Sequence, residues 1–289
     1  MTPQAPYSAP PTLMPIERPD ADLPIVRYPT FERTTKKMTL ARDTWLIFRR
    51  SVILTLRQPT WLFFGIMYPV LYLVLFGPLL DGAVSQSGAG VSAYNWFVPG
   101  LLVQVALFGS AFVGFGLIAE LRSGVVERMR VTPMSRAAML LGRSLRDVVL
   151  LLLQALIMVV LALPFGLNLD PVGLAVSFGV LALVALVMSP LSYAAGLILK
   201  SEDAFAPVVQ SLVMPLLLLS GILLPMALAP DWLKFLSTIN PLTHAVDAVR
   251  ALFNGDWGNP EVAIGATITA ALAVIAVWIG ARTFSRANA

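Results

Sequence analysis

The residue types that carry acid–base or metal chemistry are scarce in this chain. Its 289 residues include no Cys and a single His, His244. This excludes disulfides, thiolate metal sites, Cys nucleophiles and His-rich metal sites, so we expect no bound metal. Asp247 follows His244 by three residues, so one helical face could hold both as a catalytic pair. A capped or interfacial His is the simpler interpretation, because no nucleophile motif accompanies the pair; a membrane enzyme using His244 and Asp247 stays as an alternative.

The sequence contains no motif for binding ATP phosphates. A P-loop reads Gly-x-x-x-x-Gly-Lys-[Ser/Thr], and its backbone amides and Lys hold the phosphates. The lysines follow no glycine at any position: Lys36, Lys37, Lys200 and Lys234. We therefore predict no catalytic residue and no bound cofactor in this chain. Any energy from ATP must come from another chain.

Charged side chains of both signs gather in the segment 120–147. Glu120, Glu127, Arg128 and Arg130 fall on a short stretch of helical character that Pro133 ends. A helix of this kind, held at the membrane face, suits docking to a soluble partner protein. A solvated loop that only follows the charge distribution of membrane proteins is equally consistent with the pattern.

The elements that must position these residues are membrane-spanning helices. Hydrophobic residues make up 57% of the chain and charged residues only 12%, against about 25% charged in soluble domains. So much apolar surface needs a bilayer as its solvent. We predict an all-α integral membrane protein with six spans, most of them near the roughly 20 residues that cross a hydrocarbon core. The predicted spans are 61–80, 97–119, 148–169, 172–199, 208–224 and 262–281.

Two further segments precede the six-span domain 61–289. Residues 1–37 are rich in proline and lack apolar periodicity, which predicts a disordered tail. Residues 38–60 carry Trp45, Phe48 and Val52 near helical spacing, with arginines beside them. This pattern predicts an amphipathic helix in the membrane surface.

The basic residues predict the orientation. All Lys and Arg except Lys234 and Arg250 fall before the first span or in loops on one side of the membrane. Basic residues gather on the cytoplasmic side, so both termini should be cytoplasmic. The same rule explains the net charge of +4, and we expect no nucleic-acid partner.

The predicted spans contain no Asp, Glu, Lys or Arg. Carriers coupled to protons or ions commonly bury such a group, so its absence disfavours an ion-coupled secondary carrier without excluding sodium coupling through backbone carbonyls. Candidates for the substrate path are the aromatic face of the first span, on which a planar amphiphile could stack, and the polar Gln104 in the second span. Ordinary packing or lipid contact explains the same aromatic spacing. The aromatic residues are Phe64, Tyr68, Tyr72 and Phe76.

The segment 225–261 should lie outside the membrane or re-enter it. Pro225 and Pro241 divide this stretch into apolar pieces, such as the one carrying Trp232, that are too short to span. Such pieces suit re-entrant or interfacial helices.

Three motifs in this region resemble the signature of the ABC-2 family of transporter permeases. They are Leu-Ser-Gly-x-x-x-Pro at 219–225, Pro-x-Trp-Leu at 230–233 and Asn-Pro-Leu-Thr at 240–243, followed by Arg250. The segment Glu-Arg-Met-Arg-Val-Thr-Pro-Met-Ser-Arg at 127–136 resembles the first coupling helix of that family. The likeness covers roughly residues 38–289 and is closest to the daunorubicin/doxorubicin-resistance permeases of actinobacteria, including mycobacteria.

The resemblance implies the permease subunit of an ATP-driven exporter in the bacterial cytoplasmic membrane. Two permeases, either identical copies or related chains, would pair, and two ATP-binding subunits would supply ATP and Mg. The cargo would be a hydrophobic or amphiphilic molecule, either an anthracycline-like drug or a complex envelope lipid. By analogy, the ATPase would contact Glu120, Arg122, Glu127, Arg128, Met129, Arg130 and Pro133, with a smaller contact at Glu202 and Asp203. An external gate would contain Pro225, Trp232, Asn240 and Pro241.

Overall fold

The computed structural model describes residues 40–57, 59–87, 93–124, 135–222, 226 and 229–286, with the backbone alone for 59–64 and 80–87. Every regular element in these ranges is a helix, as predicted. The first elements are α1 (Leu40–Leu56), α2 (Pro59–Ser87), α3 (Ala93–Ala111), α4 (Gly114–Arg122) and α6 (Arg136–Ala162). A 3-10 turn η1 (Leu163–Phe165) follows, and then α7 (Pro171–Leu199), α8 (Glu202–Leu219), α9 (Asp231–Ile239), α10 (Pro241–Phe253) and α11 (Pro260–Arg286). The predicted tail 1–37 lies outside the described residues.

Several of these helices are long and apolar enough to cross a membrane. Within the described residues there are five such stretches: Ala93–Arg122, Arg136–Phe165, Pro171–Leu199, Glu202–Leu219 and Pro260–Arg286. The described part of α2 adds a shorter apolar helix, Gly65–Leu79. The prediction of an all-α membrane protein is therefore confirmed.

Polar side chains cap the N-termini of α6, α7 and α10. Ser135 accepts a hydrogen bond from the amide of Ala138 at the start of α6. Asp170 accepts from two amides at the start of α7, and Asn240 accepts from the amide of Leu242 at the start of α10. Each cap satisfies a backbone N–H that has no partner within its own helix.

Several helix boundaries differ from the predicted spans, and the predicted second span, 97–119, is divided between α3 and α4. The helix α6 begins at Arg136 rather than near 148, because Arg143, Arg146 and Asp147 find polar partners inside the bundle. The helix α8 runs from Glu202 to Leu219 instead of 208–224. Its acidic first turn suits the positive end of the helix dipole, and Gly221 with φ +72° follows its last turn.

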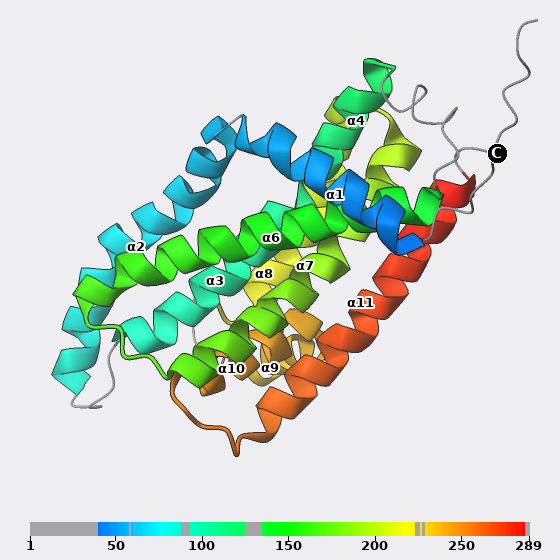
Figure 1. Ribbon diagram of the computed structural model, residues 1–289. Coiled ribbons are helices and arrows are strands. Elements are labelled where there is room, and N and C mark those ends of the chain that lie inside the picture. Colours follow the sequence, from blue (N-terminus) through cyan, green and yellow to red (C-terminus); the bar gives the residue numbers. More distant parts are fainter. Residues whose placement is uncertain are drawn as a thin grey trace, which may run out of the picture. The chain divides into compact units, whose positions relative to one another are not determined.

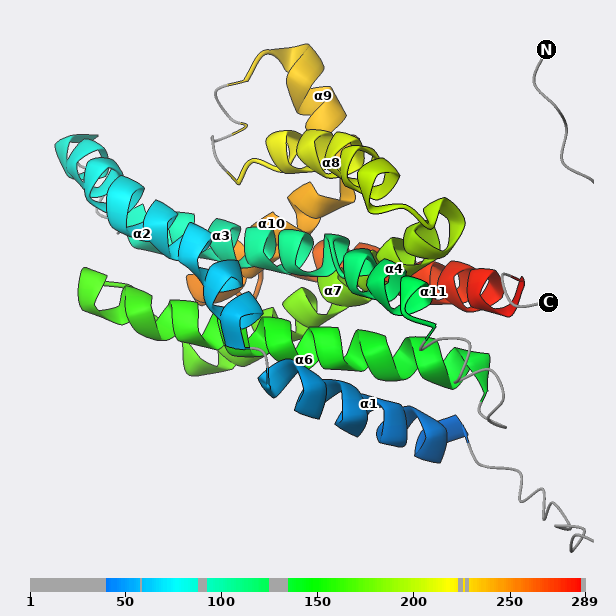
Figure 2. The ribbon, with the colours of Figure 1, turned by 90° about the horizontal axis from the view of Figure 1, so that it is seen from above.

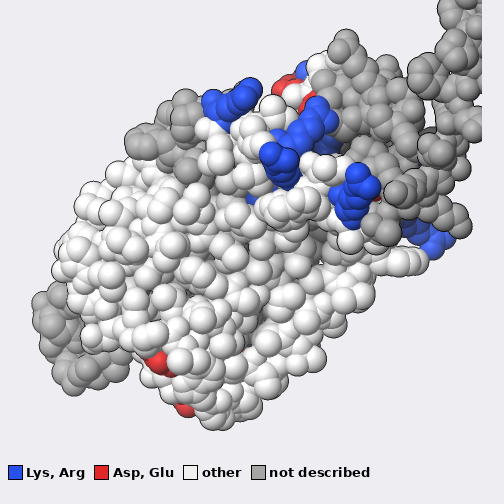
Figure 3. All heavy atoms as spheres, in the orientation of Figure 1, with Lys and Arg blue, Asp and Glu red and all other residues white. Residues whose placement is uncertain are grey.

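Contacts between helix ends define two ends of the bundle. The basic end joins α1, the end of α4, the start of α6 and the end of α11; here Arg136 donates to the carbonyl of Ser285. The opposite end joins the starts of α3, α7 and α11 with α10; here Asn95 donates to the carbonyl of Asn168. Figures 1 and 2 show the long helices running between these ends. In Figure 3 the visible Lys and Arg gather at the basic end, and the middle of the same face shows no charged residue.

The amphipathic helix α1 lies along α6 (Figure 2). A Cβ on Gly142 would come within 2.8 Å of the Thr44 carbonyl, so only glycine permits this approach. Asp43 is 1% exposed and accepts from the amide of Ser135, while Trp45 on another face of α1 is 59% exposed. The free apolar face fits the interfacial position that the sequence predicts.

Candidate functional site

Two ion pairs fix the helix α4 at the basic end. Glu120 meets Arg143 of α6, with 2.5 Å between Oε2 and Nη2. Arg122 meets Glu202 of α8, with 3.3 Å between Nη1 and Oε1. The predicted coupling residues Glu120, Arg122 and Glu202 thus come together, and α4 is attached to two other helices directly before the segment 125–134. Asp203, in the first turn of α8, is exposed.

The remaining predicted coupling residues lie outside the described residues. They are Glu127, Arg128, Met129, Arg130 and Pro133.

A buried ion pair inside the bundle was missed by the sequence reasoning. Arg146 donates to Asp147, with 2.9 Å between Nε and Oδ1. The other carboxylate oxygen of Asp147 accepts from Ser189 at 2.8 Å and from Tyr193 at 2.7 Å, both on α7. Arg146 also donates to Thr55 of α1 at 3.3 Å. One carboxylate therefore ties α6 to α7, and its arginine partner extends the tie to α1.

The spacing of these residues carries a signal that could have revealed the network. Ser189 and Tyr193 are four residues apart and therefore share one face of α7. Arg146 and Asp147 stand near the start of a long apolar stretch, where unpaired charges would be costly.

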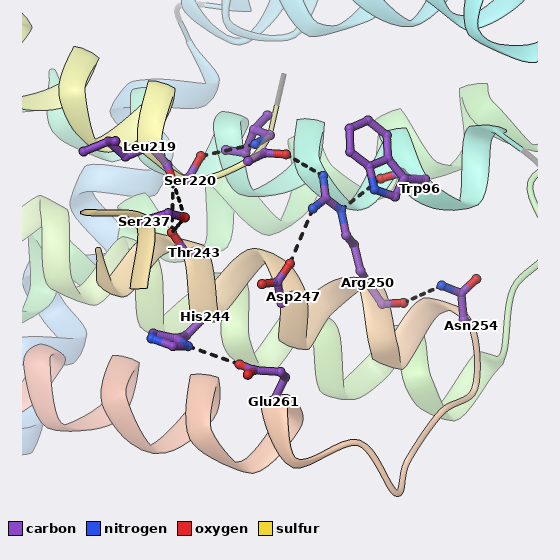
Figure 4. A network of polar contacts seen from close by, with 12 residues as sticks. Trp96, Leu219, Ser220, Ser237, Thr243, His244, Asp247, Arg250, Asn254 and Glu261 are labelled. Atoms are coloured by element: carbon purple, nitrogen blue, oxygen red, sulfur yellow. Dashed lines mark hydrogen bonds and ion pairs between the residues drawn. The ribbon is translucent and has the colours of Figure 1, made fainter. Parts of the chain in front are cut away.

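At the opposite end, Arg250 of α10 joins three separate segments (Figure 4). Its guanidinium donates to the carbonyl of Gly221 at 2.8 Å and to the carbonyl of Trp96 at 3.2 Å. It also lies 4.2 Å from the centre of the Trp96 ring, a cation–π contact. An ion pair of 3.4 Å connects it to Asp247. Arg250 thus holds the backbone after α8 against the start of α3.

A second set of hydrogen bonds fixes the junction of α8, α9 and α10. Asn240 caps α10 and donates to the carbonyl of Leu216 at 2.8 Å. Ser237 and Thr243 both donate to the carbonyl of Leu219, at 2.8 and 3.1 Å (Figure 4). Since α8 has ended, these side chains satisfy carbonyls that its last turn leaves free.

A shallow hollow of about 320 Å³ opens beside Arg250, between α10 and the start of α11. Asp247, Asp256 and Glu261 contribute carboxylates to its wall. Burial raises the pKa of Asp247 above its ordinary value, although Arg250 opposes the change. Burial also lowers the pKa of the Arg250 guanidinium. Among the described residues, no group of three His, Asp or Glu side chains is placed to hold a metal ion.

Comparison with known proteins agrees with this architecture. Residues 42–254 match the family model of ABC-2 type transporters. The chain belongs to the ABC-2 transporter family. It is therefore a multi-pass permease subunit of an ABC transporter, as the motifs at 219–250 predicted.

Relatives of this ABC-2 permease carry names of transport permeases and of drug-resistance permeases. A protein of Cyanophora paradoxa named as a transport permease, ycf38, is 31% identical over 74% of each chain. The daunorubicin resistance ABC transporter permease protein DrrB1 of Streptomyces coeruleorubidus is 26% identical over 78% of this chain and 79% of its own. A protein of Mycobacterium tuberculosis named for doxorubicin resistance, DrrC, is 26% identical over 66% of this chain and 69% of its own.

The aromatic face of α2 is present in the permease. Tyr68 and Tyr72 are joined by a hydrogen bond of 2.9 Å between their hydroxyls, and the Tyr72 and Phe76 rings stack at 5.2 Å. The side chain of Phe64 lies outside the described residues. Gln104 of α3 is 3% exposed and lies in the core rather than on an exposed aromatic face.

The predicted external gate residues that the structure describes differ in burial. Asn240 is buried at the start of α10, where Pro241 occupies the first helical position. Trp232 on α9 is 65% exposed. Pro225 lies outside the described residues.

His244 pairs with a different carboxylate from the one that its sequence spacing suggested. Its Nδ1 lies 3.1 Å from Glu261 of α11 (Figure 4). Its Nε2 lies 3.1 Å from the carbonyl of Thr238. Burial lowers the pKa of His244, but the hydrogen bonds with Glu261 and Thr238 and the nearby carboxylates outweigh it, so the pKa is raised above its ordinary value. Both nitrogens face oxygen acceptors, which favours the imidazolium form and a structural role.

This pairing predicts a pH-dependent contribution to stability. The folded-state pKa of His244 lies above its unfolded value of about 6.5, so the stabilisation is complete below that pH and is lost as the pH rises through the folded-state pKa. We expect the difference in unfolding temperature between wild type and His244→Ala to be larger at about pH 5.5 than at about pH 8.5. Thermal unfolding in detergent measures it. An equal or larger difference at the higher pH would contradict this assignment.

Proposed function

We infer that this chain is the permease subunit of an ATP-driven exporter that moves hydrophobic or amphiphilic molecules out across the bacterial cytoplasmic membrane. The observation that carries the proposal is the mounting of α4 by Glu120–Arg143 and Arg122–Glu202. These pairs anchor the helix that leads into the segment resembling a coupling helix. Movement imposed there by an ATPase would be passed to α6 and α8.

The distribution of charge supports the orientation of this exporter. Lys and Arg gather at the basic end, and basic residues favour the cytoplasmic side (Figure 3). The basic end would therefore face the cytoplasm and the ATP-binding subunits. The network around Arg250 would then lie at the external side, where it would close the outer end of the pathway.

Cargo and assembly follow by analogy with relatives. The names of relatives, which refer to daunorubicin and doxorubicin resistance, support an aromatic, amphiphilic drug as the cargo of this chain. On the aromatic face of α2, Tyr68 and Phe76 are exposed and Tyr72 between them is part-buried, so this face offers rings on which such a drug or a lipid could stack. The chain would pair with a second permease, either identical or related. Two ATP-binding subunits would supply ATP and Mg.

An ion-coupled carrier is the second candidate, because Asp147 is a buried carboxylate in a candidate membrane span. However, both oxygens of Asp147 already accept hydrogen bonds, from Arg146 on one side and from Ser189 and Tyr193 on the other. This arrangement suits a structural tie better than a site that must repeatedly gain and lose a cation.

Transport into inverted vesicles that contain the permease and its ATP-binding subunit separates the two candidates. We expect fluorescent anthracycline or labelled lipid to accumulate when ATP is present and ionophores have dissipated the ion gradients. A non-hydrolysable ATP analogue serves as the control. Accumulation that needs an ion gradient and continues without ATP would overturn the exporter and favour the carrier.

A further inference from the structure

The joint between α3 and α4 leaves two backbone groups without their usual helical partners. The helix α3 ends at Ala111 and α4 begins at Gly114. Across the joint the hydrogen bonds shorten to i→i−3: the amide of Phe115 donates to Phe112, and that of Gly116 donates to Val113. The carbonyl of Ala111 and the amide of Gly114 are thereby released from the helical pattern.

One side chain from α7 satisfies both released groups. The hydroxyl of Ser192 donates to the carbonyl of Ala111 at 2.6 Å and accepts from the amide of Gly114 at 2.9 Å. Ser192 is 5% exposed. A single buried hydroxyl therefore holds the two helices in their present relation.

Close packing leaves the joint little freedom while this hydroxyl is in place. A Cβ on Gly114 would lie 2.5 Å from the ring of Phe205 and 2.6 Å from the carbonyl of Ser192. Phe205 of α8 is fully buried and meets Phe115 edge-to-face at 4.8 Å between ring centres. Two helices, α7 and α8, thus press on the joint from the core.

The other end of α4 carries the ion pairs of Glu120 and Arg122 described above. The whole of α4 spans only nine residues, and its Leu117 and Ile118 are buried. Such a short, packed helix moves as a unit. A push at the ion-paired end must therefore be taken up where the helical hydrogen bonds are already interrupted.

We propose that the α3–α4 joint is the pivot of the transport stroke and that Ser192 is the positioning residue that holds it in one of two arrangements. The proposal rests on the proposed function, since the ATP-binding subunit supplies the push. The ATP-binding subunit can shift the joint between two arrangements only if its interaction with the permease differs between them. The two hydrogen bonds of Ser192 hold the present arrangement against that shift, because they are lost when α4 tilts away from α7.

The test combines hydrogen exchange on the permease in lipid nanodiscs with coupling measurements on the permease and its ATP-binding subunit in sealed vesicles. We expect Ser192→Ala to speed exchange in peptides covering residues 110–117 by about tenfold, because it leaves two buried backbone groups unsatisfied. The amount of cargo moved per ATP hydrolysed should fall. Ser211→Ala is the matched control, because Ser211 is exposed and donates only to the carbonyl of Val208 within α8.

A second pair of variants disturbs the joint without touching Ser192. Gly114→Ala forces a methyl group against Phe205 and should reproduce both effects. Gly116→Ala is its control, because no described atom lies within 4 Å of the position its methyl group would take. Unchanged exchange, or faster exchange with normal coupling in both Ser192→Ala and Gly114→Ala, would overturn the pivot. A wild-type complex that moves no cargo on ATP hydrolysis would instead count against the proposed function. The exchange measurement needs no ATPase, so it would still test whether Ser192 holds the joint.

Discussion

Replacing Asp147 by alanine should lower the free energy of unfolding by about 3–5 kcal/mol, the usual cost of removing one partner of a buried ion pair. The side chain of Asp147 is 4% exposed, and that of Arg146 is 24% exposed. Without the carboxylate, Arg146 keeps its charge inside the bundle, and Ser189 and Tyr193 lose their common acceptor. Denaturant-induced unfolding in detergent micelles measures the change.

Two further variants show whether the lost stability comes from the ion pair itself. Asp256→Ala serves as the matched control, because that carboxylate accepts from Asn259 in an exposed turn; we expect a change below about 1 kcal/mol. The double replacement Arg146→Met with Asp147→Leu should regain much of the loss, since apolar side chains can substitute for a buried pair. Wild-type stability in Asp147→Ala would contradict the structural role of the network.

Replacing Arg250 by methionine should cost about 2–4 kcal/mol, because hydrogen bonds from a charged group and a cation–π contact are lost together. The Arg250 side chain is 13% exposed and donates to two backbone carbonyls, those of Trp96 and Gly221. Removing it also leaves the part-buried carboxylate of Asp247 without its cation. The same unfolding measurement applies.

The geometry of Arg250 predicts how the stability of its variants should rank. Arg250→Lys should retain only part of the stability, because an ammonium cannot reproduce the planar, divergent donors or the stacking of guanidinium on an indole ring. Lys234→Met is the control, since Lys234 forms an exposed pair of 3.8 Å with Asp231, worth about 0–1 kcal/mol. If Arg250→Lys matched wild type, the contacts with Trp96 and Gly221 would not stabilise this end of the bundle.

The sequence was a good guide where a single physical property decides the structure. Long apolar stretches predicted the membrane helices, because only a bilayer accommodates them. Pro241, which was expected to divide the external segment, stands at the first position of α10. The motifs at 219–250 predicted the family that residues 42–254 confirm.

The sequence was a poor guide where partners come from distant segments. Charge-free stretches placed the third span too late, because hydropathy cannot show that Arg146 and Asp147 neutralise each other against α7. The sequence favoured a capped or interfacial His244, but no local pattern showed that its partner is Glu261, seventeen residues on. The role of Ser192 depends on an interruption in another helix, which no local pattern around position 192 records.

The same limit applies to the coupling residues. The charged segment 120–136 suggested a docking helix, and Glu120 and Arg122 prove to be anchored to α6 and α8. Their partners, Arg143 and Glu202, lie 23 and 80 residues away along the chain. Sequence alone gives the charges, and only the packing of α4 gives their pairing.

We propose that this permease transmits work from a separate ATPase, and the deciding measurement is ATP hydrolysis by the purified chain, alone and with its ABC ATP-binding subunit. We expect no hydrolysis by the chain alone, a stable complex with the subunit, and hydrolysis by that complex that rises when an anthracycline or an envelope lipid is added. Failure to form a complex, or hydrolysis that neither the permease nor any cargo alters, would contradict it.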